Sequence, residues 1–243
     1  MNRPLMVAFD VSNQQTALKL AQALGPDGRG KTVKVGMELY YKEGAQILQK
    51  LQELGYAIFL DLKLYDIPHT VEKAMLQLAR LGVDYVTVHA MGGREMLQAA
   101  KRGLVQGAAE SGLPAPKLLA ITELTSASEE IVTREQNCRL SLKEQVLSLA
   151  KLAKDSGCDG VVCSALEVEA LRRAVGDDFF YLVPGIRMAD DQVGDQVRVA
   201  TPAMASKAGA SAIVVGRPIN QSPQPKRAYE RYLADWQEGT KEE

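Results

Sequence analysis

Short apolar runs alternate with longer amphipathic stretches along the whole chain. Eight of these runs are rich in Val, Ile and Leu and are continuously apolar rather than alternating, which is typical of buried parallel strands. They cover residues 5–11, 32–36, 57–63, 85–90, 118–124, 160–165, 179–186 and 212–217. The stretches between them are helical in period: Ile47, Leu48, Leu51 and Leu54, for example, share one helix face.

Glycines and polar residues mark the ends of these elements. Four glycines, at 55, 82, 157 and 209, each close a helical stretch just before a strand, so the repeating unit is helix, glycine, strand. Polar or glycine positions stand at or near the C-terminal ends of most strands: Asp10, Lys34, Asp61 with Lys63, His89, Thr122 with Thr125, Ser164, and Gly216 with Arg217. A closed barrel brings all these ends to one mouth, whereas a doubly wound sheet would gather them at its switch point. We therefore predict an α/β protein with a single (β/α)8 TIM barrel, and one catalytic domain over residues 1–243.

Composition narrows the class of partner. The length of 243 residues suits one such barrel, although it also allows two small domains. The formal charge of -1 gives no electrostatic case for nucleic acid or an anionic membrane, so we expect a small-molecule substrate. No apolar run approaches the ~20 residues of a membrane span, and no signal peptide is recognisable. Three cysteines without C-x-x-C spacing suggest neither a disulfide framework nor a zinc site, and we expect a cytoplasmic protein.

One motif match has the wrong context. Residues 25–32 satisfy the P-loop pattern G-x-x-x-x-G-K-[ST]. A P-loop follows a strand and opens a helix, so that the helix N-terminus cradles phosphate, but here a helix precedes the motif and a strand follows it. We do not expect nucleotide hydrolysis.

The third strand ends in the segment DLKLYDIPHT, residues 61–70. The two-residue period of a strand puts Asp61 and Lys63 on one face, which in a barrel looks into the mouth. An ammonium kept protonated by neighbouring carboxylates can deliver a proton to carbon at neutral pH. A structural ion pair is the alternative for an isolated D-x-K, but Lys34 and Asp10 on neighbouring strand ends favour a functional cluster, because such charges are costly to bury.

A second group follows the last two strands. Pro184-Gly185-Ile-Arg187 comes after the seventh strand and Gly216-Arg217 after the eighth, where many barrels bind phosphate. Glycines expose backbone N–H groups, and an arginine offers bidentate hydrogen bonds to an anion. Either piece alone has the alternative interpretation of a turn glycine with a surface arginine, but together, at adjacent strand ends, they favour phosphate binding. The long polar connections 126–141 and 187–199 follow strand ends and are candidate lids.

His89 is a weaker candidate. A histidine at a strand end is more often structural than catalytic. With only two histidines in the chain, a histidine-rich metal site is not available, and we expect no metal.

The segment DLKLYDIPHT resembles the D-x-K-x-x-D-I-P-x-T signature of the orotidine 5'-phosphate decarboxylase family. Further matches follow in family order: VAFD ending at Asp10, VKVG at Lys34, LTS at Thr125, PGIR at Arg187, GDQ at Gln196 and VGRP at Arg217. The resemblance implies decarboxylation of orotidine 5'-phosphate to uridine 5'-phosphate, the last step in making that nucleotide de novo, without a cofactor.

The resemblance also implies roles for individual residues. Lys63 would be the general acid between Asp61 and Asp66, and Lys34 would complete the alternating charges. Asp66 and Thr70 would reach into the site of a neighbouring subunit, which implies a homodimer with shared active sites. The remaining contacts would be Asp10 and Lys34 with ribose, Thr125 with the pyrimidine, and Pro184, Arg187, Gln196, Gly216 and Arg217 with the phosphate end.

Two rival functions remain at this point. A sister enzyme such as hexulose-phosphate synthase resembles this family in D-x-K-x-x-D but uses magnesium and enediolate chemistry. The Ile67-Pro68 pair, Thr70 and the LTS run favour the decarboxylase. A non-catalytic nucleotide-binding module is the other rival, and the intact set of lysines and aspartates argues against it.

Overall fold

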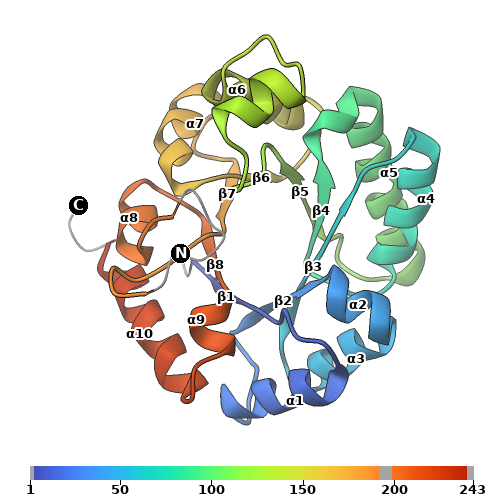
Figure 1. Cartoon of the computed structure of the whole chain (residues 1–243). Coiled ribbons are helices and arrows are strands. Elements are labelled where there is room, and N and C mark those ends of the chain that lie inside the picture. The colour runs from blue at the N-terminus through green and yellow to red at the C-terminus, as the bar shows by residue number, and fades with distance from the viewer. Residues whose placement is uncertain (1–2, 192–198, 240–243) are drawn as a thin grey trace.

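Parallel strands close into a barrel in the computed structural model, which describes residues 3–191 and 199–239 (Figure 1). The strands are β1 (Leu5–Ala8), β2 (Thr32–Gly36), β3 (Ala57–Leu64), β4 (Tyr85–His89), β5 (Lys117–Ile121), β6 (Gly160–Val162), β7 (Phe180–Val183) and β8 (Ala212–Val215). They pair in sequence order, and β8 closes onto β1 with Val214 opposite Met6. The predicted (β/α)8 barrel is confirmed.

Helices surround the barrel on its outside (Figure 1). They are α1 (Gln14–Ala23), α2 (Met37–Glu43), α3 (Ala45–Glu53), α4 (Pro68–Ala79), α5 (Gly93–Ser111), α6 (Leu142–Asp155), α7 (Val168–Val175), α8 (Pro202–Lys207), α9 (Arg217–Asn220) and α10 (Pro225–Glu238). All four glycines predicted to end helices have a positive φ, for example Gly55 with φ 89° and Gly209 with φ 88°. None of the helices in the described ranges is long and apolar enough to cross a membrane.

The P-loop-like residues 25–32 connect the end of α1 to the start of β2. The motif therefore lies between a helix and a following strand, as the sequence predicts. Its glycines do not open a helix, so the phosphate-cradling geometry of a P-loop is not formed here.

Several strands are shorter than predicted at their C-terminal ends. β5 ends at Ile121 rather than at 124, and β7 ends at Val183 rather than at 186. The reason is the short β6, whose last pairs are Val162 with Ile121 and with Leu182. Beyond that level the ladder ends, and the following residues turn into the loops around the mouth.

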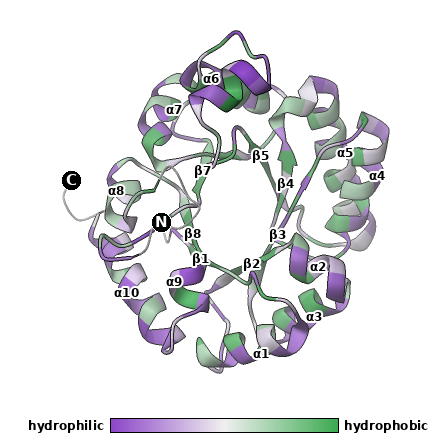
Figure 2. Ribbon diagram, viewed as in Figure 1, coloured by the Kyte–Doolittle hydropathy of each residue, from purple (hydrophilic) through white to green (hydrophobic). Residues whose placement is uncertain are grey.

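Two apolar regions hold the barrel together. The larger one packs the outward faces of the strands against the helices, and Leu60 and Leu62 belong to it. The smaller one fills the interior of the barrel with Met6, Ala8, Phe59, Leu119, Leu182, Ala212 and Val214. Figure 2 shows green strands at the centre, surrounded by helices with both green and purple residues. Since Phe59 points inward, the strand period directs Asp61 inward above it.

Candidate active site

A cavity of about 440 Å³ opens at the C-terminal ends of the strands. Its volume is in the range of small-molecule sites. Nine of the predicted site residues line it: Asp10, Lys34, Asp61, Lys63, Thr125, Pro184, Arg187, Gly216 and Arg217. The barrel thus brings side chains from both ends of the sequence to one mouth.

Lysines and aspartates alternate along one wall of this cavity. The Nζ atom of Lys34 lies 2.8 Å from Asp10 Oδ1 and 3.7 Å from Asp61 Oδ2. Lys63 Nζ lies 2.8 Å from the same Asp61 Oδ2. Gly36 makes room for this arrangement, because a Cβ at that position would lie 3.1 Å from the Lys34 ammonium and 3.2 Å from the Asp10 carboxylate.

The mutual attraction in this cluster outweighs the cost of burial. Burial by itself lowers the pKa of Lys34, but the carboxylates of Asp10 and Asp61 bring that pKa above its usual value. Burial likewise raises the pKa of Asp61, while Lys34, Lys63 and the hydrogen bonds to this carboxylate bring the pKa below its usual value. Lys34 and Asp61 are therefore stabilised in their charged forms by their neighbours in the cluster.

The backbone at Lys63 departs from the regular strand that the sequence suggests. Lys63 has φ 52°, a left-handed conformation that is uncommon outside glycine. Near it the register shifts: Leu60 lies opposite Val86, but Leu64 lies opposite Val88. The bulge gives β3 two extra residues against β4 and re-aims the chain at Lys63.

The turns after β7 and β8 contribute the predicted phosphate group of residues to the cavity lining. Arg187 is 8% exposed and donates from Nη1 to the carbonyl of Ile186 at 2.7 Å. Gly216, which follows β8, and the exposed Arg217, the first residue of α9, line the same cavity. Gln196, predicted to join them, lies outside the described residues. Two guanidinium groups thus accompany a glycine turn at the mouth.

Asp66 and Thr70 lie away from the cavity. Both are exposed, and neither is among the residues that line the mouth. The Asp66 carboxylate accepts the backbone N–H of Ile67 at 2.7 Å. His89 also lies outside the lining. The centre of its ring is 5.8 Å from that of Tyr65. Its pKa is lowered, mainly by burial and also by the positive charge of Lys63.

Glu123 is a cavity residue that the sequence reasoning did not select. It is 4% exposed, and its Oε2 accepts from Gln136 at 3.2 Å. Its Oε1 has no hydrogen-bond partner among the described residues. The sequence feature that could have identified Glu123 is its position between Thr122 and Thr125, two polar residues already selected at this strand end. Within residues 3–191 and 199–239, no three His, Cys, Asp or Glu side chains converge as metal ligands do.

The closed barrel and its charged mouth define a (β/α)8-barrel enzyme. A model of the orotidine 5'-phosphate decarboxylase / HUMPS family matches residues 3–232, and the chain belongs to this family. It is 54% identical over 230 residues to the orotidine 5'-phosphate decarboxylase of Lactobacillus acidophilus, covering 95% of this chain and 97% of that protein. It is 47% identical to that of Listeria innocua, covering 97% and 99%.

Solved structures give the same picture. A crystal structure of the Lactobacillus acidophilus enzyme superimposes with a TM-score of 0.87 at 50% identity, covering 97% of this chain and 99% of that one. The Pyrococcus horikoshii enzyme superimposes with a TM-score of 0.72 at 24% identity, over 96% of this chain and 99% of that one. At that identity the second match supports the fold alone.

Proposed function

We propose that this protein decarboxylates orotidine 5'-phosphate to uridine 5'-phosphate, the last step of de novo synthesis of that nucleotide. The observation that carries the proposal is the alternating cluster Asp10, Lys34, Asp61 and Lys63 at the mouth of the barrel. Relatives at about half identity over nearly the whole chain have the name of this enzyme, which supports the same substrate.

Lys63 is the proposed general acid. The bond between C6 of the pyrimidine and the carboxylate carbon breaks, carbon dioxide leaves, and the electron pair stays on C6. The Lys63 ammonium stabilises this pair and transfers a proton to C6, so no cofactor is required. Asp61, whose Oδ2 lies 2.8 Å from the Lys63 Nζ, holds the ammonium in place. Lys34 and Asp66 are the other proposed members of this catalytic set.

The remaining cavity residues are proposed to bind the substrate. Asp10 and Lys34 form the ribose end, and Thr125 from the loop after β5 contacts the pyrimidine. Pro184, Arg187, Gly216 and Arg217, joined by Gln196, form the phosphate end. Two guanidinium groups on the phosphate supply binding energy remote from the reacting carbon, which organises the mouth for the chemical step.

The direct test is the ultraviolet absorbance of orotidine 5'-phosphate mixed with purified protein and a metal chelator. The proposal expects a loss of orotate absorbance that the chelator does not affect. A turnover that the chelator abolishes would point instead to the magnesium-dependent sister enzymes. Folded protein that binds uridine 5'-phosphate without any turnover would be a binding module, and either result overturns the proposal.

We also propose that two copies form a homodimer with shared active sites. Asp66 and Thr70 are exposed and lie next to two exposed apolar side chains, Tyr65 at 61% and Ile67 at 66%. Such a surface suits a self-complementary contact that carries Asp66 toward the partner's cavity.

Mixing two inactive variants tests the shared site. Lys63→Ala and Asp66→Asn place their defects on different subunits of each proposed site. After unfolding and refolding together, the mixture regains about a quarter of wild-type activity, because half of the dimers are mixed and have one intact site. Absence of any recovery, with dimers present in sedimentation, would contradict sharing.

A further inference from the structure

A buried hydroxyl on β4 connects the aspartate and the lysine of β3. Thr87 is 1% exposed, and its Oγ1 accepts the backbone N–H of Lys63 at 2.9 Å. The same oxygen donates to Asp61 Oδ1, also at 2.9 Å. A threonine hydroxyl has one proton and two lone pairs, so it can make both hydrogen bonds at once.

The bulge in β3 explains why Lys63 requires this partner. The register shift between Leu60 and Leu64 interrupts the regular pairing with β4 at Lys63. A buried N–H without a partner is unfavourable, and the left-handed backbone of Lys63 needs support from its surroundings. Thr87 meets both needs, because it replaces the missing ladder acceptor with a side-chain oxygen.

The contact also orients the carboxylate of Asp61. With Oδ1 held by Thr87, Oδ2 faces Lys63 Nζ at 2.8 Å and Lys34 Nζ at 3.7 Å. Burial raises the pKa of Asp61, and the hydrogen bond from Thr87 joins the two lysines in bringing it below its usual value. A rotated Asp61 would no longer hold both ammonium groups.

We infer that Thr87 is a positioning residue for the reaction: its hydroxyl holds the Lys63 backbone and the Asp61 carboxylate in the geometry of proton transfer. The inference rests on the proposed decarboxylation. Thr87 is not among the residues lining the cavity, so it acts through Asp61 and Lys63 rather than on the substrate.

Thr87→Val, which keeps the shape and removes the hydroxyl, is the test. We expect kcat to fall by about 10- to 100-fold, the cost of a small displacement of the reacting groups, while KM and the Kd for uridine 5'-phosphate stay within about 2-fold. Thr87→Ser, which restores the hydroxyl, should recover most of the lost kcat. If the valine variant does not fold, Thr87→Cys fills a similar volume with a weak hydrogen-bonding group. It should likewise lower kcat and leave KM and the Kd for uridine 5'-phosphate nearly unchanged.

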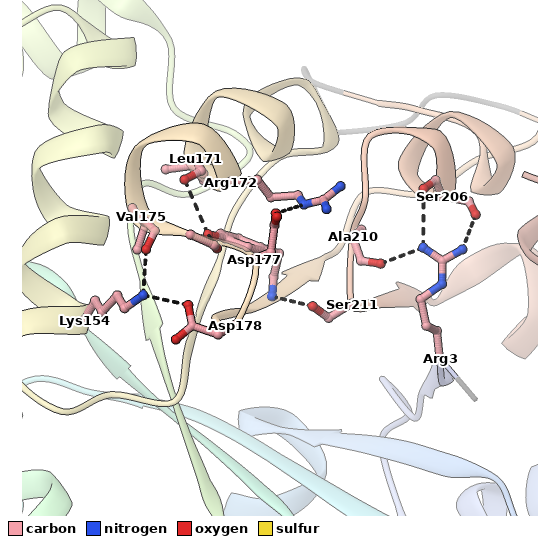
Figure 3. Close-up of polar contacts among 12 residues, drawn as sticks. Arg3, Lys154, Leu171, Arg172, Val175, Asp177, Asp178, Ser206, Ala210 and Ser211 are labelled. Atoms are coloured by element: carbon pink, nitrogen blue, oxygen red, sulfur yellow. Dashed lines mark hydrogen bonds and ion pairs between the residues drawn. The ribbon is translucent and has the colours of Figure 1, made fainter. Parts of the chain in front are cut away.

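Ser211 provides a matched control at the other end of the barrel. Its Oγ accepts the backbone N–H of Tyr181 at 3.0 Å, so it too is a hydroxyl that binds a strand N–H (Figure 3). Ser211→Ala should lower the melting temperature and leave kcat unchanged.

The outcomes separate the two proposals. Wild-type protein without turnover overturns the decarboxylase function and this role of Thr87 together. Wild-type turnover with an unchanged kcat in the valine variant overturns the role of Thr87 alone. The role is also wrong if kcat in the Ser211 variant falls as much as in the valine variant.

Discussion

At the mouth of the barrel Lys34 and Asp61 are almost buried, and each lies near two side chains of opposite charge. At the opposite end, Lys101 and Asp159 are more exposed and pair with each other. The side chains of Lys34 and Asp61 are 12% and 10% exposed, against 29% and 31% for Lys101 and Asp159. Both ends therefore contain short lysine–aspartate contacts, but in different surroundings.

The contacts at the opposite end join structural elements. Asp159 also accepts the N–H of Leu118, which connects the start of β6 to the start of β5. Lys154 donates to the carbonyl of Val175 at 2.6 Å and pairs with Asp178 at 2.8 Å (Figure 3). Backbone groups and partial exposure satisfy these charges, whereas the charges at the mouth depend on one another beside an open cavity. Clusters of nearly buried charges beside a cavity, such as the one at the mouth, are typical of functional sites.

Lys63→Ala is the largest expected effect that tests this contrast. It should lower kcat by more than about 10⁴-fold, because both the proton donor and its charge are lost, while uridine 5'-phosphate still binds. Steady-state kinetics and calorimetry measure the two quantities. Lys154→Ala, a lysine removed from the opposite end, is the control and should keep wild-type kcat. Near-normal turnover in Lys63→Ala would remove the proposed distinction between the two ends.

Arg217→Ala tests the phosphate wall of the mouth. The substitution removes a guanidinium group that contacts the phosphate. The resulting fall in kcat/KM should correspond to a loss of about 4 kcal/mol in transition-state stabilisation. Arg172→Ala provides the comparison, since Arg172 pairs with Asp177 at 2.8 Å at the opposite end and should leave kcat/KM unchanged. A loss below about 1 kcal/mol for Arg217→Ala would contradict its role in phosphate binding.

Asp61→Asn tests how much the buried cluster adds to stability, and how this depends on pH. The substitution leaves the nearly buried Lys34 and the partly buried Lys63 with one carboxylate fewer, so we expect the free energy of unfolding to fall by about 3 kcal/mol at pH 7. The pKa of Asp61 is lowered in the folded state, so its contribution is present above the unfolded value of about 3.9 and is lost as the pH falls through the folded value.

Denaturant unfolding of wild type and variant between pH 7 and pH 3 measures this difference. It should be largest at neutral pH and should shrink in acid, below about pH 4. Asp159→Asn is the control at the opposite end. A difference for Asp61→Asn that grows as the pH falls would mean that this carboxylate is not stabilised in its charged form.

Much of this architecture was predictable from hydrophobic pattern. Buried parallel strands are continuously apolar, so all eight could be placed, and Asp61 and Lys63 could be assigned to one face by the strand period. The bulge at Lys63 was not predictable, because the left-handed lysine is supported by a hydrogen bond that its backbone N–H donates to Thr87 on the next strand. Thr87 and Glu123 were missed for a similar reason: single polar residues among apolar ones do not show their partners until the strands are in register.

Lys101→Met is the smallest expected effect and the sharpest check on the opposite end. Methionine keeps most of the aliphatic length of lysine, so the substitution removes the ion pair with Asp159 and little packing. Since both side chains are about a third exposed and Asp159 keeps its bond from the Leu118 N–H, the free energy of unfolding should fall by only about 1 kcal/mol. Thermal or urea unfolding measures it, and kcat should not change. A loss of activity without a loss of stability would show that charges at this end reach the reaction, and the contrast between the two ends would then be wrong.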